Sequence, residues 1–239
     1  MKVTMANLTL HYHALSSQCQ KSPIALDATG VEANKLASNL GNSVKRAGAL
    51  AFWRTGNMPL LIHRGRSVPK SSSIFEYLQR HDASPSQLLI PVHPDGALQA
   101  FLPDRLCEPC GMTPIQAPQA DLLRPDGERN TLGAQQARTK LASAFAWRGR
   151  HLKRHTWIAS DIFSRVDCAA ASASASALFY ATTHAPIASP HGPVQSYLDR
   201  LTDYGPDARV IEAAGPNFKF CPGRGRGSRR FFALQSGIR

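Results

Sequence analysis

The chain has 239 residues, of which 43% are hydrophobic, and carries a formal net charge of +12. This length and composition suit one large domain or two modest ones, and they exclude a wholly disordered chain. No apolar run reaches the ~18–20 residues that cross a bilayer. The first residues, Met1 to Thr4, lack the charged-then-apolar pattern of a signal peptide. We therefore expect a soluble, cytoplasmic protein without a membrane partner.

The positive charge is concentrated in stretches that contain no acid. Seven bases lie between Glu32 and Glu76, seven more lie between Glu128 and Asp161, and the tail after Cys221 has arginines but no carboxylate. Such a surface attracts anions, which include small acidic ligands, nucleic acids and anionic membranes. Because a charged stretch is more often a solvated face, nucleic-acid binding through the Gly-Arg tail ranks below a small-molecule function without being excluded.

The cysteines do not form a recognisable framework. They are odd in number and scattered, which argues against a secreted disulfide scaffold: Cys19, Cys107, Cys110, Cys168 and Cys221. Cys107 and Cys110 have the C-x-x-C spacing, but no second pair supplies the other ligands of a structural zinc site. We interpret the spacing as coincidence on a helix or loop, and we expect no metal.

The first part of the chain alternates strand and helix signals. Residues 8–12 alternate apolar and polar side chains, as in a half-buried strand. A short polar turn follows, and residues 19–29 then predict a helix that stops at Gly30. Strand, turn and helix in this order form the first half of a βαβ unit. Leu36 and Leu40 are candidates for a second strand.

Further strands are predicted before the chain becomes helical. Residues 57–62 predict a strand entered through Pro59, where the missing N–H is tolerated. Arg64-Gly65 is a turn candidate, and residues 67–68 predict a short strand after it. Ser73 and Glu76 have the spacing of a capping box and predict the start of a helix.

Helical signals dominate from about residue 97. Ala137, Leu141, Phe145 and Leu152 mark one face of a basic amphipathic helix. Another helix is predicted after residue 164, with a serine as N-cap and an acid at its third position. Residues 169–177 form an Ala/Ser run that is compatible with a tightly packed helix, and the tail after residue 220 is predicted to be disordered.

Four segments in order resemble the soluble glutathione S-transferases, and are nearest to the serine-using theta and delta classes and their bacterial relatives. Residues 10–21 are similar to the family's opening strand, catalytic turn and first helix, and residues 56–61 to its cis-proline segment. Residues 68–78 resemble its glutathione-binding motif, and residues 161–167 its buried N-capping box. Each motif is weak alone, but four in the right order and spacing are specific.

The resemblance covers residues 8 to about 220 and implies a two-domain fold. The implied fold is an α/β thioredoxin-like domain with the order βαβαββα, followed by an all-α domain. We expect a glutathione-binding domain at residues 1–84, a linker at 85–96, the helical domain at 97–220 and the basic tail at 221–239. The implied activity is transfer of the glutathione thiolate to a small electrophilic substrate in detoxification, by a homodimer.

The residues that would activate glutathione lie at the first turn. A thiol with a pKa near ~8.5 is little ionised at neutral pH, so a hydroxyl donor and a helix N-terminus both help to form the thiolate. Ser16 lies just before the first predicted helix, where both effects act, and begins Ser16-x-x-Cys19, at the place of a thioredoxin's reactive cysteine. Ser17 is the alternate. The competing interpretation is that both serines only cap the helix.

The resemblance also implies which residues bind glutathione. They surround the proline segment and the start of the next helix: Met58, Pro59, Lys70, Ser71 and Ser72. A cis Met58–Pro59 bond would present the Met58 backbone to the cysteinyl part, and Ser71 would bind the γ-glutamyl carboxylate. Lys70 departs from the family, which has a glutamate there to meet the α-amino group. It either repels that amine, attracts the neighbouring carboxylate or faces solvent without a role.

Prolines interrupt the segment expected to form the first long helix of the second domain. Pro103, Pro109, Pro114 and Pro118 lie within it, and an interior proline costs a helix ~3 kcal/mol or more. The helix is therefore either broken or kinked. In the family it contributes to the dimer interface and the substrate pocket. Together with Lys70, this departure supports the alternative of a non-catalytic binding protein that has kept the scaffold.

Overall fold

The computed structural model describes eight stretches of the chain, namely residues 3–14, 16–37, 58–81, 88–115, 117, 127–173, 192–206 and 209–210. The predictions for Leu40, for residues 174–177 and for the tail 221–239 lie outside these stretches, as does the helix expected between the second and third strands. No helix within the described stretches is long and apolar enough to span a membrane.

Four strands form one mixed sheet in the order β2-β1-β3-β4. They are β1 (Val3–Tyr12), β2 (Val31–Ala37), β3 (Leu60–His63) and β4 (Arg66–Pro69). β1 runs parallel to β2 and antiparallel to β3, and β4 returns antiparallel to β3. This arrangement confirms the predicted strands and the thioredoxin-like topology of the N-terminal part.

Burial along the strands explains the sequence patterns. In β1, Leu8, Leu10 and Tyr12 are buried and alternate with partly exposed residues, as period-2 geometry requires. All four residues of β3 are buried because a central strand is covered on both faces. The continuous apolar run before His63 is therefore the signature of a central strand.

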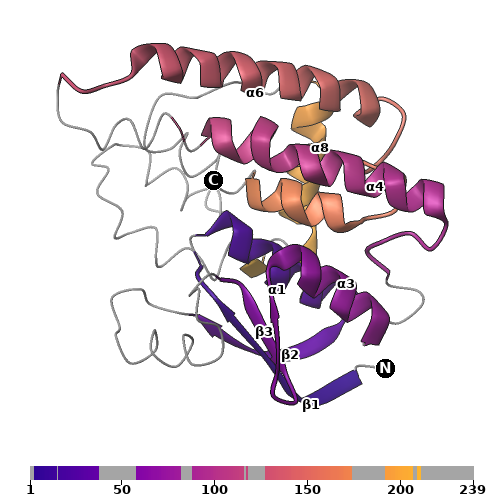
Figure 1. Ribbon diagram of the computed structural model, residues 1–239. Helices are drawn as coiled ribbons and strands as arrows, with labels where there is room; N and C mark the ends of the chain where they lie inside the picture. The colour runs from indigo at the N-terminus through magenta and orange to yellow at the C-terminus, as the bar shows by residue number, and fades with distance from the viewer. Residues whose placement is uncertain are drawn as a thin grey trace, which may run out of the picture.

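Two helices cover the sheet on the side of the helical domain (Figure 1). Helix α1 (Ser17–Thr29) buries Ile24, Ala25 and Leu26, and ends at Gly30, whose φ of 67° lies in the left-handed region that glycine adopts without strain. Helix α3 (Ser71–His81) buries Ile74, Phe75 and Leu78. The predicted first helix and its glycine stop are thus confirmed.

The predicted capping box at Ser73 is wrong, because α3 begins at Ser71 and Ser73 is an exposed residue inside it. The helix start is set instead by Lys70, which has a φ of 70° and whose carbonyl accepts the Ile74 N–H at 3.0 Å. The left-handed conformation of Lys70 turns the chain out of β4, so the helix begins before the serine with the favoured spacing.

The C-terminal part consists of helices only, within the residues described. Helix α4 (Pro94–Cys107) continues into a π-helical segment, η2 (Glu108–Met112), and α6 (Thr131–Leu152), a helix at residues 165–173 and α8 (Pro193–Asp203) follow. In Figure 1, α4 and α6 lie above the sheet domain, and α8 passes behind them. The all-helical prediction is confirmed for this part.

The proline-rich segment is helical without a break between residues 94 and 112. Pro103 lies within α4, and the backbone changes to π-helical geometry at η2, which contains Pro109. A proline ring clashes with the carbonyl four residues earlier in an α-helix, and the wider π turn relieves such a clash. Helix α4 begins at Pro94, inside the range expected for a linker.

The helix at residues 165–173 begins with the predicted capping box. Asp167 accepts hydrogen bonds from the Ser164 N–H at 2.9 Å, the Ser164 hydroxyl at 3.0 Å, the Ile158 N–H at 3.0 Å and the Tyr197 hydroxyl at 2.9 Å. Burial raises the pKa of the Asp167 carboxyl. One carboxylate thus ties the helix start to the preceding loop and to α8.

We expect Asp167→Asn to lower the free energy of unfolding by ~1–3 kcal/mol. Asparagine has one acceptor oxygen where aspartate has two, so some of the buried donors are left without a partner. Urea denaturation followed by circular dichroism measures this loss. Asp203→Asn, at the exposed end of α8, is the matched control and should change stability by less than ~0.5 kcal/mol. Equal stability of the two variants would contradict the assigned role.

Candidate functional site

Strand register brings three predicted site segments to one edge of the sheet. His11 near the end of β1 pairs with Leu60 at the start of β3, and Leu60 pairs with Pro69 at the end of β4. The residues after β1, before β3 and after β4 therefore meet at the same edge. These are the segments that carry Ser16, Met58–Pro59 and Lys70–Ser71.

Ser16 is held at this edge by its backbone. Its N–H donates to the His13 carbonyl at 3.1 Å, and its own carbonyl accepts the N–H groups of Cys19 and Gln20, both at 2.9 Å. The Ser16 side chain makes no capping hydrogen bond to α1. Ser16 thus occupies the N-cap position of α1, but its hydroxyl is not used to cap the helix.

Ser16 and its alternate, Ser17, differ in exposure. Ser16 is half-buried, whereas Ser17 is the first residue of α1 and only 3% exposed. A ligand at this edge can reach the Ser16 hydroxyl more readily than that of Ser17. Of the two candidates, the geometry favours Ser16.

The electrostatics at the start of α1 favour an anion beside Ser16. The helix N-terminus carries partial positive charge, and the first turn of α1 contains no acidic residue to offset it. Burial raises the pKa of the Cys19 thiol, although a hydrogen bond with the Ser16 side chain works in the opposite direction. Cys19 is therefore a thiol at neutral pH, and does not compete as the anion.

Two histidines near this edge were not predicted as part of the site. His11 and His13 are each half-buried, and burial lowers the pKa of both side chains. They are consequently neutral at pH 7 and add no charge beside Ser16. His11 and His13 are separated only by Tyr12, but nothing in that short sequence places them at this edge, and only the strand register reveals their position.

The other predicted residues are brought together by a single backbone contact. The Lys70 N–H donates to the Pro59 carbonyl at 3.1 Å. The Met58–Pro59 peptide bond is cis, as the resemblance implied. Met58 is half-buried, Pro59 and Ser71 are buried, and Lys70 and Ser72 are exposed. Ser71 is the first residue of α3, so its N–H belongs to the free donors at that helix start.

The described residues contain no group of three or more His, Cys, Asp or Glu side chains that could hold a metal ion. The arrangement instead offers a hydroxyl, free backbone donors at two helix starts and one exposed ammonium group. Such a set suits an extended anionic ligand.

Comparison of the whole chain with solved structures finds proteins of similar fold. A delta-class glutathione transferase of Nilaparvata lugens matches with a TM-score of 0.72 and 17% identity, over 89% of this chain and 98% of that one. The chain has the glutathione S-transferase fold. No protein-family model matches the sequence, and no curated protein matches it either.

Two further structures with this fold contain a ligand. A glutathione S-transferase of Methylobacterium radiotolerans, in complex with glutathione sulfonate, has a TM-score of 0.70 and 22% identity over 85% of this chain and 94% of that one. A theta-class enzyme of Xanthomonas axonopodis pv. citri with glutathione bound has a TM-score of 0.67 and 17% identity, over 86% and 97%. At these identities the similarity establishes the fold alone.

Proposed function

We propose that the chain is a glutathione transferase that binds glutathione at the sheet edge formed by Ser16, Met58–Pro59 and Ser71. The observation that carries this proposal is the convergence of these three segments, set by the pairs His11–Leu60 and Leu60–Pro69. The neighbours of the same fold that hold glutathione or glutathione sulfonate support it.

Ser16 activates the thiol in this proposal. Its hydroxyl donates a hydrogen bond to the glutathione sulfur, and the start of α1 adds positive potential, so the thiol loses its proton to solvent more easily. The thiolate then attacks an electrophilic carbon of the second substrate. A sulfur–carbon bond forms as the leaving group departs with its electron pair. No metal or redox partner is needed for this balance.

Met58 and Ser71 orient the tripeptide. The Met58 backbone pairs with the cysteinyl part, and the Ser71 hydroxyl and N–H bind the γ-glutamyl carboxylate at the start of α3. Pro59 and Ser72 flank these contacts. Ser71 is the first residue of α3, so its donors lie at a helix start, where an anion is favoured.

Lys70 departs from the family pattern, which has a glutamate at this position, and we propose that this difference weakens the binding of glutathione. We expect Lys70→Glu to tighten glutathione binding by about tenfold, because it replaces a charge that repels the α-amino group with one that attracts it, a change of ~1.4 kcal/mol. Lys70→Gln, which only removes the charge, should give an intermediate gain. Isothermal titration calorimetry measures both. Weaker binding in Lys70→Glu would mean that the lysine binds the carboxylate.

The remaining parts of the proposal follow the family expectation. We propose a glutathione-binding domain at residues 1–84, a linker at 85–96, of which residues 94–96 already belong to α4, and a helical domain at 97–220. We also propose a cytoplasmic homodimer that acts in detoxification. Light scattering of the purified chain tests the dimer.

The second candidate function is that of a non-catalytic binding protein with the glutathione S-transferase fold. Lys70 is exposed beside Ser71 and would repel the α-amino group of glutathione, which favours this second candidate. Retention on immobilised glutathione together with conjugation of an electrophilic nitroaromatic compound supports the transferase. Retention by a folded sample without turnover supports the second candidate, and loss of both overturns the glutathione site.

A further inference from the structure

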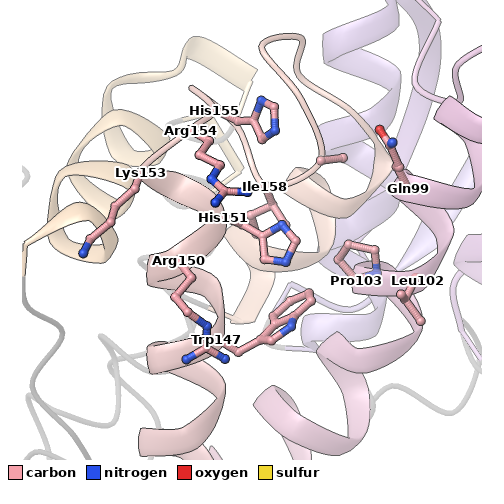
Figure 2. A pocket seen from close by; sticks show the side chains of 11 residues that line it. Gln99, Leu102, Pro103, Trp147, Arg150, His151, Lys153, Arg154, His155 and Ile158 are labelled. Atoms are coloured by element: carbon pink, nitrogen blue, oxygen red, sulfur yellow. The ribbon is translucent and has the colours of Figure 1, made fainter.

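A cavity of about 570 Å³ lies in the helical domain, apart from the glutathione edge. It is bounded by the middle of α4, the last two turns of α6 and the segment that follows α6, as Figure 2 shows. Its lining includes none of the residues assigned to glutathione. A volume of this size fits a small organic ligand.

One wall of the cavity is apolar and aromatic. Leu102 and Pro103 of α4 face Trp147 of α6, and Ile158, which is 1% exposed, also lines the cavity. Trp147 also approaches His151, with their ring centroids 4.5 Å apart. A flat indole beside aliphatic side chains forms a surface on which a planar ring can stack.

The opposite side of the cavity is strongly basic. Arg150, Lys153 and Arg154 line it together with two histidines, and no carboxylate lines it among the residues described. In Figure 2, Arg154 points toward His151, whereas Lys153 extends away from the other lining side chains. The two guanidinium groups are therefore the cations best placed to meet a ligand.

The positive charge at this side of the cavity is larger than the negative partial charge at the C-terminus of α6. A helix C-terminus carries roughly half a negative elementary charge, whereas three permanent cations gather here. Asp161, whose carboxylate lies 3.9 Å from His155 Nδ1, is exposed and supplies one more negative charge. The uncompensated positive charge favours a ligand with more than one negative charge, and guanidinium groups bind phosphate through paired hydrogen bonds.

We propose that this cavity binds an adenine nucleotide. The ring stacks on Trp147 against Pro103, the phosphates bind Arg150 and Arg154, and the amide of Gln99, at the rim on α4, pairs with the edge of the adenine. A glutamine amide can donate to and accept from adenine at the same time. Since no lining carboxylate is available to hold a divalent cation among the described residues, binding is direct and independent of Mg²⁺.

Isothermal titration calorimetry of the full chain with ATP, in EDTA, tests this proposal. We expect one site per chain, with adenosine and tripolyphosphate each at least about tenfold weaker, because each lacks half of the contacts. Tripolyphosphate that binds as tightly as ATP would show a nonspecific response to the net charge of +12 and overturn the proposal. Absence of ATP binding, or binding that requires Mg²⁺, would also overturn it.

Matched variants place the ligand in the cavity. Arg154→Gln should weaken ATP binding about tenfold and Trp147→Ala should do the same, while Arg138→Gln, an exposed arginine on α6 outside the cavity, should change it less than about twofold. Equal losses in Arg154→Gln and Arg138→Gln would contradict the site. Glutathione binding is measured on the same samples, so failure of either site is seen separately.

Discussion

Replacing Ser16 with alanine should lower the rate of glutathione conjugation by about 10²–10³-fold, which corresponds to ~2.7–4 kcal/mol of lost transition-state stabilisation. The loss should appear in kcat and in kcat/KM for glutathione. Its physical reason is that the thiolate loses its hydroxyl donor while the potential of α1 remains. Steady-state kinetics with an electrophilic nitroaromatic substrate measure the change.

Ser17→Ala is the matched control for this experiment. Ser17 is buried at the first position of α1, so its replacement should leave kcat within about threefold of the original. A Ser16→Ala variant with unchanged kcat, or a larger loss in Ser17→Ala, would contradict the assignment of Ser16 as the activating group.

Replacing Arg165 with alanine should cost the fold ~3–5 kcal/mol, because the change leaves the buried Asp104 carboxylate without its ion-pair partner. The Arg165 guanidinium contacts Asp104 Oδ2 through Nη2 at 2.8 Å and through Nε at 3.1 Å. It also lies over the rings of Phe101 and Phe75, at 4.5 Å and 5.4 Å from their centroids. One side chain thus joins α3, α4 and the helix at residues 165–173.

Two controls separate the ion pair from simple loss of packing. The double variant Arg165→Met with Asp104→Leu should recover much of the stability, because it leaves no buried charge unpaired. Lys35→Ala, which breaks the partly exposed contact to Asp27, should cost less than ~1 kcal/mol. Urea unfolding measures all three. Equal stability of Arg165→Ala and Lys35→Ala would contradict the central role of Arg165.

Local patterns in the sequence predicted much of the sheet domain. The alternation around Leu10, the apolar run after Pro59 and the glycine at position 30 each correspond to a feature set by neighbouring residues. Ser164 and Asp167 were predicted as a capping box because their contact spans three residues. Features that depend on residues close in sequence can be recognised without a structure.

Features that depend on distant residues could not be predicted in this way. Arg165 looks like one base among many, and its role becomes visible only through Asp104, which lies 61 residues away. The helix start at Ser71 was misplaced because the backbone conformation of Lys70 overrides the capping pattern of Ser73. The cavity lined by Pro103 and Trp147 likewise joins α4 to α6, and no local motif marks it.

Titration of the bound glutathione thiol tests the central claim most directly. The ultraviolet absorbance of the thiolate, followed against pH, gives the pKa of glutathione in complex with the folded protein. We predict a pKa at least about one unit below that of free glutathione, with most of the difference lost in Ser16→Ala. A bound thiol that titrates at the same pH as free glutathione would contradict activation by Ser16 at the start of α1.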